Sequence, residues 1–129
     1  MTYKYFTLDE FACPCCKQNA ISPTLVALLD YARGEAGFAF KVNSGYRCEK
    51  HNEKIGGVKD SEHTKGLAAD IHAPNPHMRA QIIEKWFDAL RVHNRVDSFL
   101  PTRIGIYDTF VHLGIDFYKP HPVIWGEVT

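Results

Sequence analysis

A histidine and an aspartate that could share a metal ion lie in the stretch S-E-H-T-K-G-L-A-A-D-I-H, at positions 61–72. His63 and Asp70 are seven residues apart, which would separate them by about 10.5 Å along a continuous helix. Two ligands of one zinc ion each lie only about 2 Å from the metal. If both bind one ion, a shared helix is excluded. We then expect His63 in a loop, a turn at Gly66 and Asp70 on a strand over 67–72.

A second histidine-bearing segment runs over 110–116, where Val111, Leu113 and Ile115 alternate with a face that carries His112. Two histidines and one carboxylate, with a fourth position open to water, form the ligand set of a catalytic zinc site. Zinc in such a site lowers the pKa of water to about 7 and polarises a carbonyl group, which suits amide hydrolysis. Spacing alone leaves another interpretation open, because some of the seven histidines would lie near an aspartate by chance and form only surface hydrogen bonds.

The helices that must support these segments are indicated by hydrophobic periodicity. One helix is predicted to begin after Ser22 as N-cap, with Pro23 at its first position, and to end at Gly34 or Gly37. The clearest helix covers 78–90, where apolar residues form one stripe that we interpret as core. A further helix is expected in the polar segment 47–55.

Strands are predicted where apolar and polar residues alternate. A short strand over 38–42 is expected to lead into a turn at 43–45. The segments 103–107 and 110–116 also alternate, and we expect either two strands joined at Asp108 and Thr109 or one strand with a bulge there. These elements predict a single α+β domain over 1–129, in which a small antiparallel sheet carries the metal ligands and helices pack against it.

Composition narrows the possible partners and compartments. The chain of 129 residues carries 15 basic and 15 acidic side chains, so no net field attracts nucleic acid or an anionic membrane, and we expect neither as a partner. No apolar stretch approaches the roughly 20 residues of a membrane span. The first residues lack the apolar run of a secretory signal. We therefore expect a monomer that is cytoplasmic on synthesis.

Four cysteines lie at two places in the sequence: Cys13, Cys15 and Cys16 near the start, and Cys48 directly after Arg47. In a reducing cytosol they are expected to be thiols or metal ligands rather than disulfides. Thiolates at short spacing suit tetrahedral sulfur coordination, so a structural zinc cluster is one interpretation. The lack of a second C-x-x-C pair favours the other, in which they are small buried residues or redox-labile thiols.

The motif Ser61-x-His63-x-x-Gly66-x-Ala68-x-Asp70 is preceded by Asn43-Ser44-Gly45-Tyr46-Arg47 and followed by Phe110-Val111-His112. Together these segments resemble the zinc peptidases of the D-Ala-D-Ala carboxypeptidase type. That group includes cell-wall carboxypeptidases and phage endolysins, and it shares a fold with the hedgehog signalling domain. The resemblance covers most of the chain, since residues 10–13 and the helix from Ile21 also match.

The resemblance implies roles for individual residues. His63, Asp70 and His112 match the three zinc ligands, and Arg47 matches the arginine that holds the carboxylate of the substrate. A planar, permanently charged guanidinium can bind a carboxylate through two parallel hydrogen bonds. Ser61 is expected to brace the loop of the first ligand through its hydroxyl and to contact substrate.

Two positions depart from the pattern of this family. Thr109 lies where better-known branches carry an acidic general base, and Gly114 lies where many carry an aspartate. A hydroxyl cannot accept the proton at neutral pH, so the nearest carboxylates, Asp108 and Asp116, are the candidates for the base. Tyr107 is the candidate donor to a tetrahedral intermediate.

The function that the resemblance implies is zinc-dependent hydrolysis of an amide bond in the stem peptide of peptidoglycan. The enzyme would be a D-Ala-D-Ala carboxypeptidase or an endolysin-type endopeptidase, acting after release in phage lysis or as a virion component. The alternative is a non-catalytic module of the same fold that binds peptide or cell wall through the pocket at Arg47. Thr109 and Gly114 favour this alternative.

Overall fold

The computed structural model describes residues 3–94 and 100–126 of the chain. Its helices are α1 (Pro23–Ala36), α2 (Glu49–Lys54) and α3 (Pro76–His93), with two short 3-10 helices, η1 (Leu8–Phe11) and η2 (Glu62–Lys65). Its strands are β1 (Val42–Ser44), β2 (Ala68–His72), β3 (Arg103–Ile106), β4 (Phe110–Gly114) and β5 (Val123–Gly126). Within these residues, no helix is both long and apolar enough to cross a membrane.

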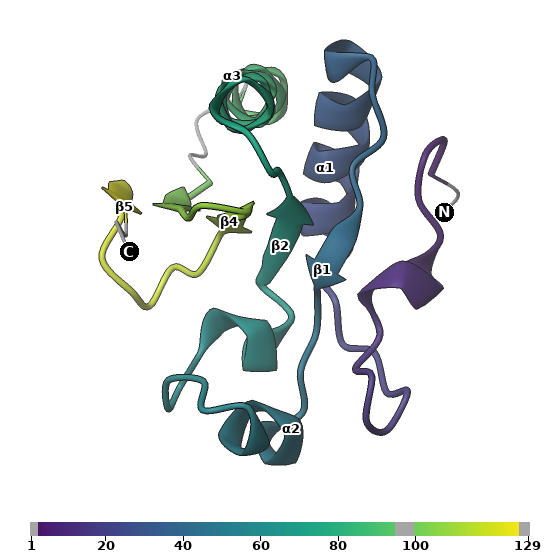
Figure 1. Ribbon diagram of the computed structural model, residues 1–129, viewed down its shortest axis with the longest axis vertical. Helices are drawn as coiled ribbons and strands as arrows, with labels where there is room; N and C mark the ends of the chain where they lie inside the picture. The colour runs from purple at the N-terminus through teal and green to yellow at the C-terminus, as the bar shows by residue number, and fades with distance from the viewer. Residues whose placement is uncertain (1–2, 95–99, 127–129) are drawn as a thin grey trace.

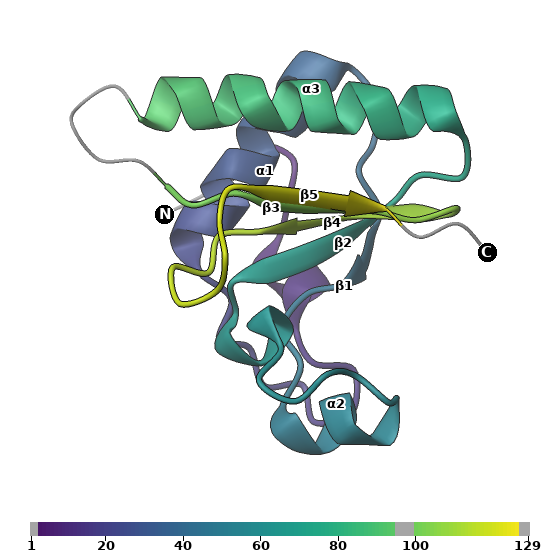
Figure 2. The same cartoon turned by 90° about the vertical axis from the view of Figure 1, so that its left-hand side faces the viewer.

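The five strands form one sheet in the order β1-β2-β4-β3-β5. Helices α1 and α3 pack together on one side of this sheet, and α2 lies on the opposite side with the loop that leads into β2 (Figures 1 and 2). This arrangement confirms the predicted α+β class.

Side-chain alternation divides the sheet into an apolar face and a polar face. Four fully buried core residues come from the two central strands: Ala69, Ile71, Val111 and Leu113. They join the hydrophobic core that α1 and α3 complete, which includes the fully buried Trp86. Because neighbouring residues on a strand point to opposite faces, Asp70 and His112 lie on the face turned away from these helices.

The ends of α1 and α3 follow from their capping residues. Ser22 accepts a hydrogen bond from the first turn of α1, and Gly37 ends that helix with a φ of 77°. The predicted cap is therefore confirmed, and of the two predicted ends the structure has Gly37, with Gly34 inside the helix. Helix α3 is longer than predicted because the side chain of Asn75 caps it and Pro76 takes the first helical position.

The first strand lies later in the sequence than the prediction of 38–42. The structure instead has β1 at Val42–Ser44, where Ser44 pairs with Asp70 of β2. The rings of Phe38 and Phe40 pack with their centroids 5.5 Å apart, and Phe40 is buried. Their alternation therefore reflects packing on the core rather than a strand.

One edge of the sheet also differs from the prediction. The hairpin of β3 and β4 is antiparallel as predicted, with Gly105 opposite His112. Strand β5 was not predicted, and it pairs with β3 in parallel, so the sheet is mixed. Its residues alternate only between half-buried and exposed, because it is an edge strand.

Candidate metal centre

The polar face of the sheet brings His63, Asp70 and His112 together. Nε2 of His63 lies 3.3 Å from Oδ1 of Asp70, and Nδ1 of His112 lies 2.9 Å from the same oxygen. One donor atom from each residue lies within 4.8 Å of the other two. Nitrogen and oxygen ligands of one tetrahedral zinc ion are roughly 3.3–3.6 Å apart. The separation of 3.3 Å between His63 and Asp70 lies in this range, whereas the 2.9 Å between His112 and Asp70 is that of a direct hydrogen bond and would lengthen slightly around an ion. The donor types and their closeness therefore fit a single divalent ion.

His63 is positioned by η2 and by the turn that follows it. The Oγ atom of Ser61 accepts a hydrogen bond from the backbone N–H of His63 at 3.2 Å, which is the predicted brace. Gly66 then ends η2 with a φ of 71°. A Cβ at Gly66 would lie 1.8 Å from the carbonyl oxygen of Ala20. Both the backbone angle and this close approach therefore require glycine.

The atoms of His63 and Asp70 that face away from the common point also form hydrogen bonds. Nδ1 of His63 donates to the carbonyl oxygen of Gly45 at 2.8 Å, which directs Nε2 toward Asp70. Asp70 lies opposite His112 in the β2–β4 register, and its Oδ2 accepts from Nη2 of Arg47 at 3.4 Å. Burial alone would raise the pKa of Asp70, but hydrogen bonds from His112 and His63 outweigh it and hold that pKa well below its usual range. Asp70 is therefore charged at neutral pH, as a carboxylate that binds a metal must be.

Glu62 is a member of this site that the sequence analysis missed. Its Oε1 lies 3.0 Å from Nε2 of His112 and 2.7 Å from Nε of Arg103, and the residue is only 4% exposed. A carboxylate that accepts the second N–H of a ligand imidazole fixes the orientation of the ring. Burial alone would lower the pKa of His112, but Asp70 and Glu62 outweigh it and raise this pKa to about 9 in the metal-free chain.

Gly114 makes room for the carboxylate of Glu62. A Cβ at Gly114 would lie 2.0 Å from Oε2 of Glu62. That oxygen is buried and has no hydrogen-bond partner among the described residues. Where the resemblance places an aspartate at 114, this chain therefore brings in a carboxylate from the first residue of η2. The signal in the sequence was a pair: an acidic residue between Ser61 and His63, and a glycine two residues after His112.

The candidate ligands line a cleft of about 380 Å³. Arg47, Ser61 and Tyr107, all predicted from the sequence, line the same cleft. Two larger hollows, of about 470 and 510 Å³, contain no comparable set of histidine and carboxylate donors among the described residues. Donor chemistry, rather than size, therefore identifies this cleft as the candidate functional site.

An aromatic wall borders the cleft beside His112. Nε1 of Trp125 donates to the hydroxyl oxygen of Tyr107 at 2.9 Å, and the Trp125 ring lies 5.4 Å from the His112 ring. Phe110 stacks on Tyr107 with the ring centroids 4.4 Å apart. Trp125 was missed because it lies on β5, which was not predicted. Since the Tyr107 oxygen accepts from Trp125, its own O–H remains available to donate to another group.

The two predicted general bases are not brought into this cleft. Asp108 lies in the exposed turn between β3 and β4, and its carbonyl oxygen accepts a hydrogen bond from Arg79. Asp116 is fully buried and forms an ion pair of 2.8 Å with Lys65. Strand β4 ends at Gly114, so the alternation that would place Asp116 on the face of His112 does not continue. This placement favours a structural role for Asp116.

A mixed α+β domain with a buried His–Asp–His set beside an open cleft is the arrangement of a metal-dependent hydrolase. The model of the peptidase M15 family matches residues 4–114, and the chain therefore belongs to the peptidase M15 family, which consists of metallopeptidases. The fold is similar to that of the L-Ala D-Glu endopeptidase ChiX from Serratia marcescens, with a TM-score of 0.55 and 18% sequence identity. That alignment covers 77% of this chain and 83% of the other. A search of curated proteins gave no match.

Proposed function

We propose that this protein is a zinc-dependent peptidase that hydrolyses an amide bond in the stem peptide of bacterial peptidoglycan. The observation that carries the proposal is the convergence of His63, Asp70 and His112 on one cleft in a chain of the M15 family. The likeness of the fold to an L-Ala D-Glu endopeptidase supports a peptide substrate of this kind. Bound by these three side chains, zinc would act as a Lewis acid toward the amide carbonyl and toward water.

Hydrogen bonds to groups outside the ligand set keep the two histidine rings in place for this chemistry. The carbonyl oxygen of Gly45 holds His63, and the carboxylate of Glu62 holds His112, so neither ring needs to reorient when an ion binds. Such preorganisation lowers the cost of assembling the site.

Arg47 is suited to bind a carboxylate of the substrate. Three of the five N–H donors that a guanidinium carries bind Ser44, Asn52 and Asp70. These contacts hold the plane of the group and leave one N–H on each of Nη1 and Nη2. Arg103 and Lys119 line the same cleft, which adds positive charge. The cleft therefore favours an anionic peptide, as the carboxylate-bearing stem peptide is.

Tyr107 and Asp108 are our proposed catalytic residues. The phenol of Tyr107 lines the cleft and is held by Trp125, so it can donate to the negative charge that develops on the carbonyl oxygen. Of the two predicted bases we retain Asp108, because Asp116 is fully buried in its ion pair with Lys65. Asp108 is exposed and directly follows the cleft residue Tyr107, so its side chain would have to turn toward the cleft to act as the base. The Asp108→Asn variant should lose at least ~10²-fold in rate and keep its metal. Unchanged turnover would mean that a group other than Asp108 accepts the proton of the attacking water.

A non-catalytic binding module is the second candidate. The observation in its favour is that the carboxylates lining the described part of the cleft are Glu62 and Asp70, and both are already bound to histidine and arginine. Such a module would use Arg47 to bind peptide or cell wall without turnover.

Incubation with purified cell-wall fragments separates the two functions. A carboxypeptidase would release D-alanine, whereas an endopeptidase would create new amino termini without D-alanine. Turnover should stop on chelation, return with added zinc and be absent from His63→Ala. His77→Ala, which changes an exposed histidine outside the cleft, is the matched control. Wall binding without any turnover would support the module, and turnover that resists chelation would contradict the metal site.

The wider setting of the protein is also part of the proposal. We propose a monomer that reaches the cell wall after release, as in phage lysis or within a virion. Light scattering of the purified protein would test the monomer. Lysis of cells that produce the protein together with a membrane-permeabilising agent, and not without the agent, would support the requirement for release.

A further inference from the structure

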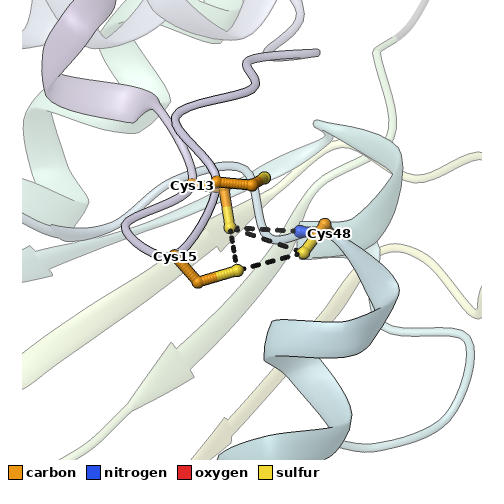
Figure 3. A group of neighbouring side chains, drawn as sticks. Cys13, Cys15 and Cys48 are labelled. Atoms are coloured by element: carbon orange, nitrogen blue, oxygen red, sulfur yellow. Dashed lines mark hydrogen bonds between the residues drawn. The ribbon is translucent and has the colours of Figure 1, made fainter.

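A second cluster of metal-ligating side chains lies away from the cleft. Cys13, Cys15 and Cys16 come from the loop after η1, and Cys48 comes from the start of α2 (Figure 3 labels three of them). The four Sγ atoms lie within 4.8 Å of one another. The closest pairs are Cys15 and Cys48 at 3.4 Å, Cys13 and Cys15 at 3.6 Å, and Cys13 and Cys48 at 3.7 Å. Residues 32 or more apart in sequence thus meet at one point.

These separations match sulfur ligands around one ion. Ligands held about 2.3 Å from a tetrahedral zinc ion have their sulfur atoms roughly 3.8 Å apart. A disulfide requires about 2.05 Å, which none of the four cysteines shows. Two thiols in ordinary contact need no third sulfur at a similar distance and no fourth within 4.8 Å. The gathering of four sulfurs is therefore the feature that a metal explains and simple packing does not.

Backbone N–H groups are directed at the same sulfurs. The N–H of Cys48 donates to Sγ of Cys13 at 3.5 Å, and the N–H of His51 donates to Sγ of Cys48 at 3.4 Å. Hydrogen bonds of this kind stabilise negative charge on sulfur, as they do around metal-bound thiolates. The surrounding backbone is therefore arranged for thiolates rather than for neutral thiols.

We propose that Cys13, Cys15, Cys16 and Cys48 bind one zinc ion in a structural, four-sulfur site. On binding, the four thiols release four protons, and Zn²⁺ forms four Zn–S bonds without any change of oxidation state. Soft thiolates select zinc over hard cations. Four protein ligands leave no position for water or substrate, so the site is structural and not catalytic.

The cysteine site joins two segments of the chain, one of which lines the candidate cleft. It ties the N-terminal loop to the segment 45–48, which carries Arg47 and the carbonyl oxygen that holds His63. The two segments already touch, since the N–H of Tyr46 donates to the carbonyl oxygen of Phe11 at 2.8 Å. A Cβ at Gly45 would lie 2.7 Å from the Phe11 backbone. A metal bound by the cysteines would hold the two segments in this close contact. It would thereby stabilise the segment 45–48, which contributes Arg47 to the candidate cleft.

Zinc content and X-ray absorption at the zinc edge test the site directly. The protein is purified under reducing conditions without chelator. Two equivalents of zinc per chain are expected, with a sulfur shell at about 2.3 Å beside a nitrogen and oxygen shell at about 2.0–2.1 Å. The double variant His63→Ala/His112→Ala should keep one equivalent and only the sulfur shell. These readouts do not depend on hydrolysis. If the site at His63 and His112 binds no zinc, one equivalent and the sulfur shell should remain, so the two proposals fail separately.

The matched variants change the exposed cysteines. Cys15→Ser/Cys16→Ser should lose one equivalent and the sulfur shell, whereas Gln18→Ser in the same exposed loop should keep both. If the cysteine variant does not fold, cobalt substitution of the unaltered protein serves instead, because sulfur ligands give an intense charge-transfer absorption. One equivalent without a sulfur shell, no such absorption, or a disulfide found by mass spectrometry under these reducing conditions would each overturn the proposal.

Discussion

Glu62 and His112 form the contact that most clearly distinguishes this site: Oε1 of Glu62 lies 3.0 Å from Nε2 of the His112 ring, whose Nδ1 faces Asp70 at 2.9 Å. The His112 imidazole therefore lies between two carboxylates: Asp70, a candidate metal ligand, and Glu62, which lies outside the ligand set and is called the outer carboxylate here. In metal centres the outer carboxylate orients the ring and increases its basicity. Here the outer carboxylate comes from the residue directly before the first candidate ligand, His63.

Replacement of Glu62 by glutamine should weaken zinc binding by about 10-fold or more, because the outer carboxylate is lost while the volume is kept. Competition with a coloured chelator would measure the dissociation constant without reference to activity. Glu49→Gln, which changes an exposed glutamate of α2, is the control. An unchanged zinc affinity would mean that Glu62 serves only its contact with Arg103.

Gly114→Ala should destabilise the protein by about 1–3 kcal/mol, because the new methyl group meets Oε2 of Glu62, a carboxylate that His112 and Arg103 hold in place. Urea denaturation would measure the loss. Gly126→Ala is the control, since a Cβ there has no contact closer than 3.7 Å. The double variant Glu62→Ala/Gly114→Ala removes the clash, so the two costs should not be additive. Additive costs would show that the two residues do not compete for space.

Arg47→Ala should raise KM with little change in zinc content. A hydrogen-bonded contact with a charged group is worth about 1.5–3 kcal/mol, so kcat/KM should fall on the order of 10–100-fold. The control is Arg91→Ala, whose side chain is 77% exposed and lies outside the cleft. An unchanged KM would remove Arg47 from substrate binding.

Tyr107→Phe should lower kcat by roughly 10²-fold if the phenol stabilises developing charge. KM and zinc content should stay close to their original values, because the ring still stacks on Phe110. Tyr118→Phe tests specificity, since Tyr118 is 90% exposed and outside the cleft. Equal effects of the two substitutions would argue against a catalytic role for Tyr107.

Asp116→Asn should destabilise the protein at neutral pH by about 1–3 kcal/mol, because the ammonium of Lys65 loses its buried partner. Burial alone would raise the pKa of Asp116, but hydrogen bonds from Lys65 and from the backbone N–H of Tyr118 outweigh it and lower this pKa. Its stabilising effect is therefore complete above the unfolded pKa of about 3.9. That effect is lost as the pH falls through the lower, folded pKa.

Urea denaturation of both proteins at pH 7 and at a series of values below 4 would check this pH dependence. The difference in unfolding free energy between the original protein and Asp116→Asn should shrink as the pH falls. A difference that is independent of pH would contradict the ion pair. A loss of turnover above 10²-fold without loss of stability would instead restore Asp116 as a candidate base.

Local features of the chain were sufficient for much of the fold. Ser22 and Gly37 predicted the ends of α1, because capping depends on residues next to the helix. Alternation over 110–116 predicted β4 and the face of His112. The contrast between the seven-residue spacing and the reach of a metal ligand excluded one continuous helix from His63 to Asp70. The structure has a turn and β2 there as predicted, but His63 lies in the short 3-10 helix η2 rather than in a loop.

The order of residues along the chain was thus enough to nominate His63, Asp70 and His112, since each lies in a motif or an alternating strand that can be recognised locally. Contacts between distant segments settled the rest: Glu62 against His112, Trp125 on an edge strand, Asp116 with Lys65, and Cys48 beside the N-terminal cysteines. These depend on strand register and on loop packing, and neither leaves a periodic signal in sequence because the partners are set by the folded backbone.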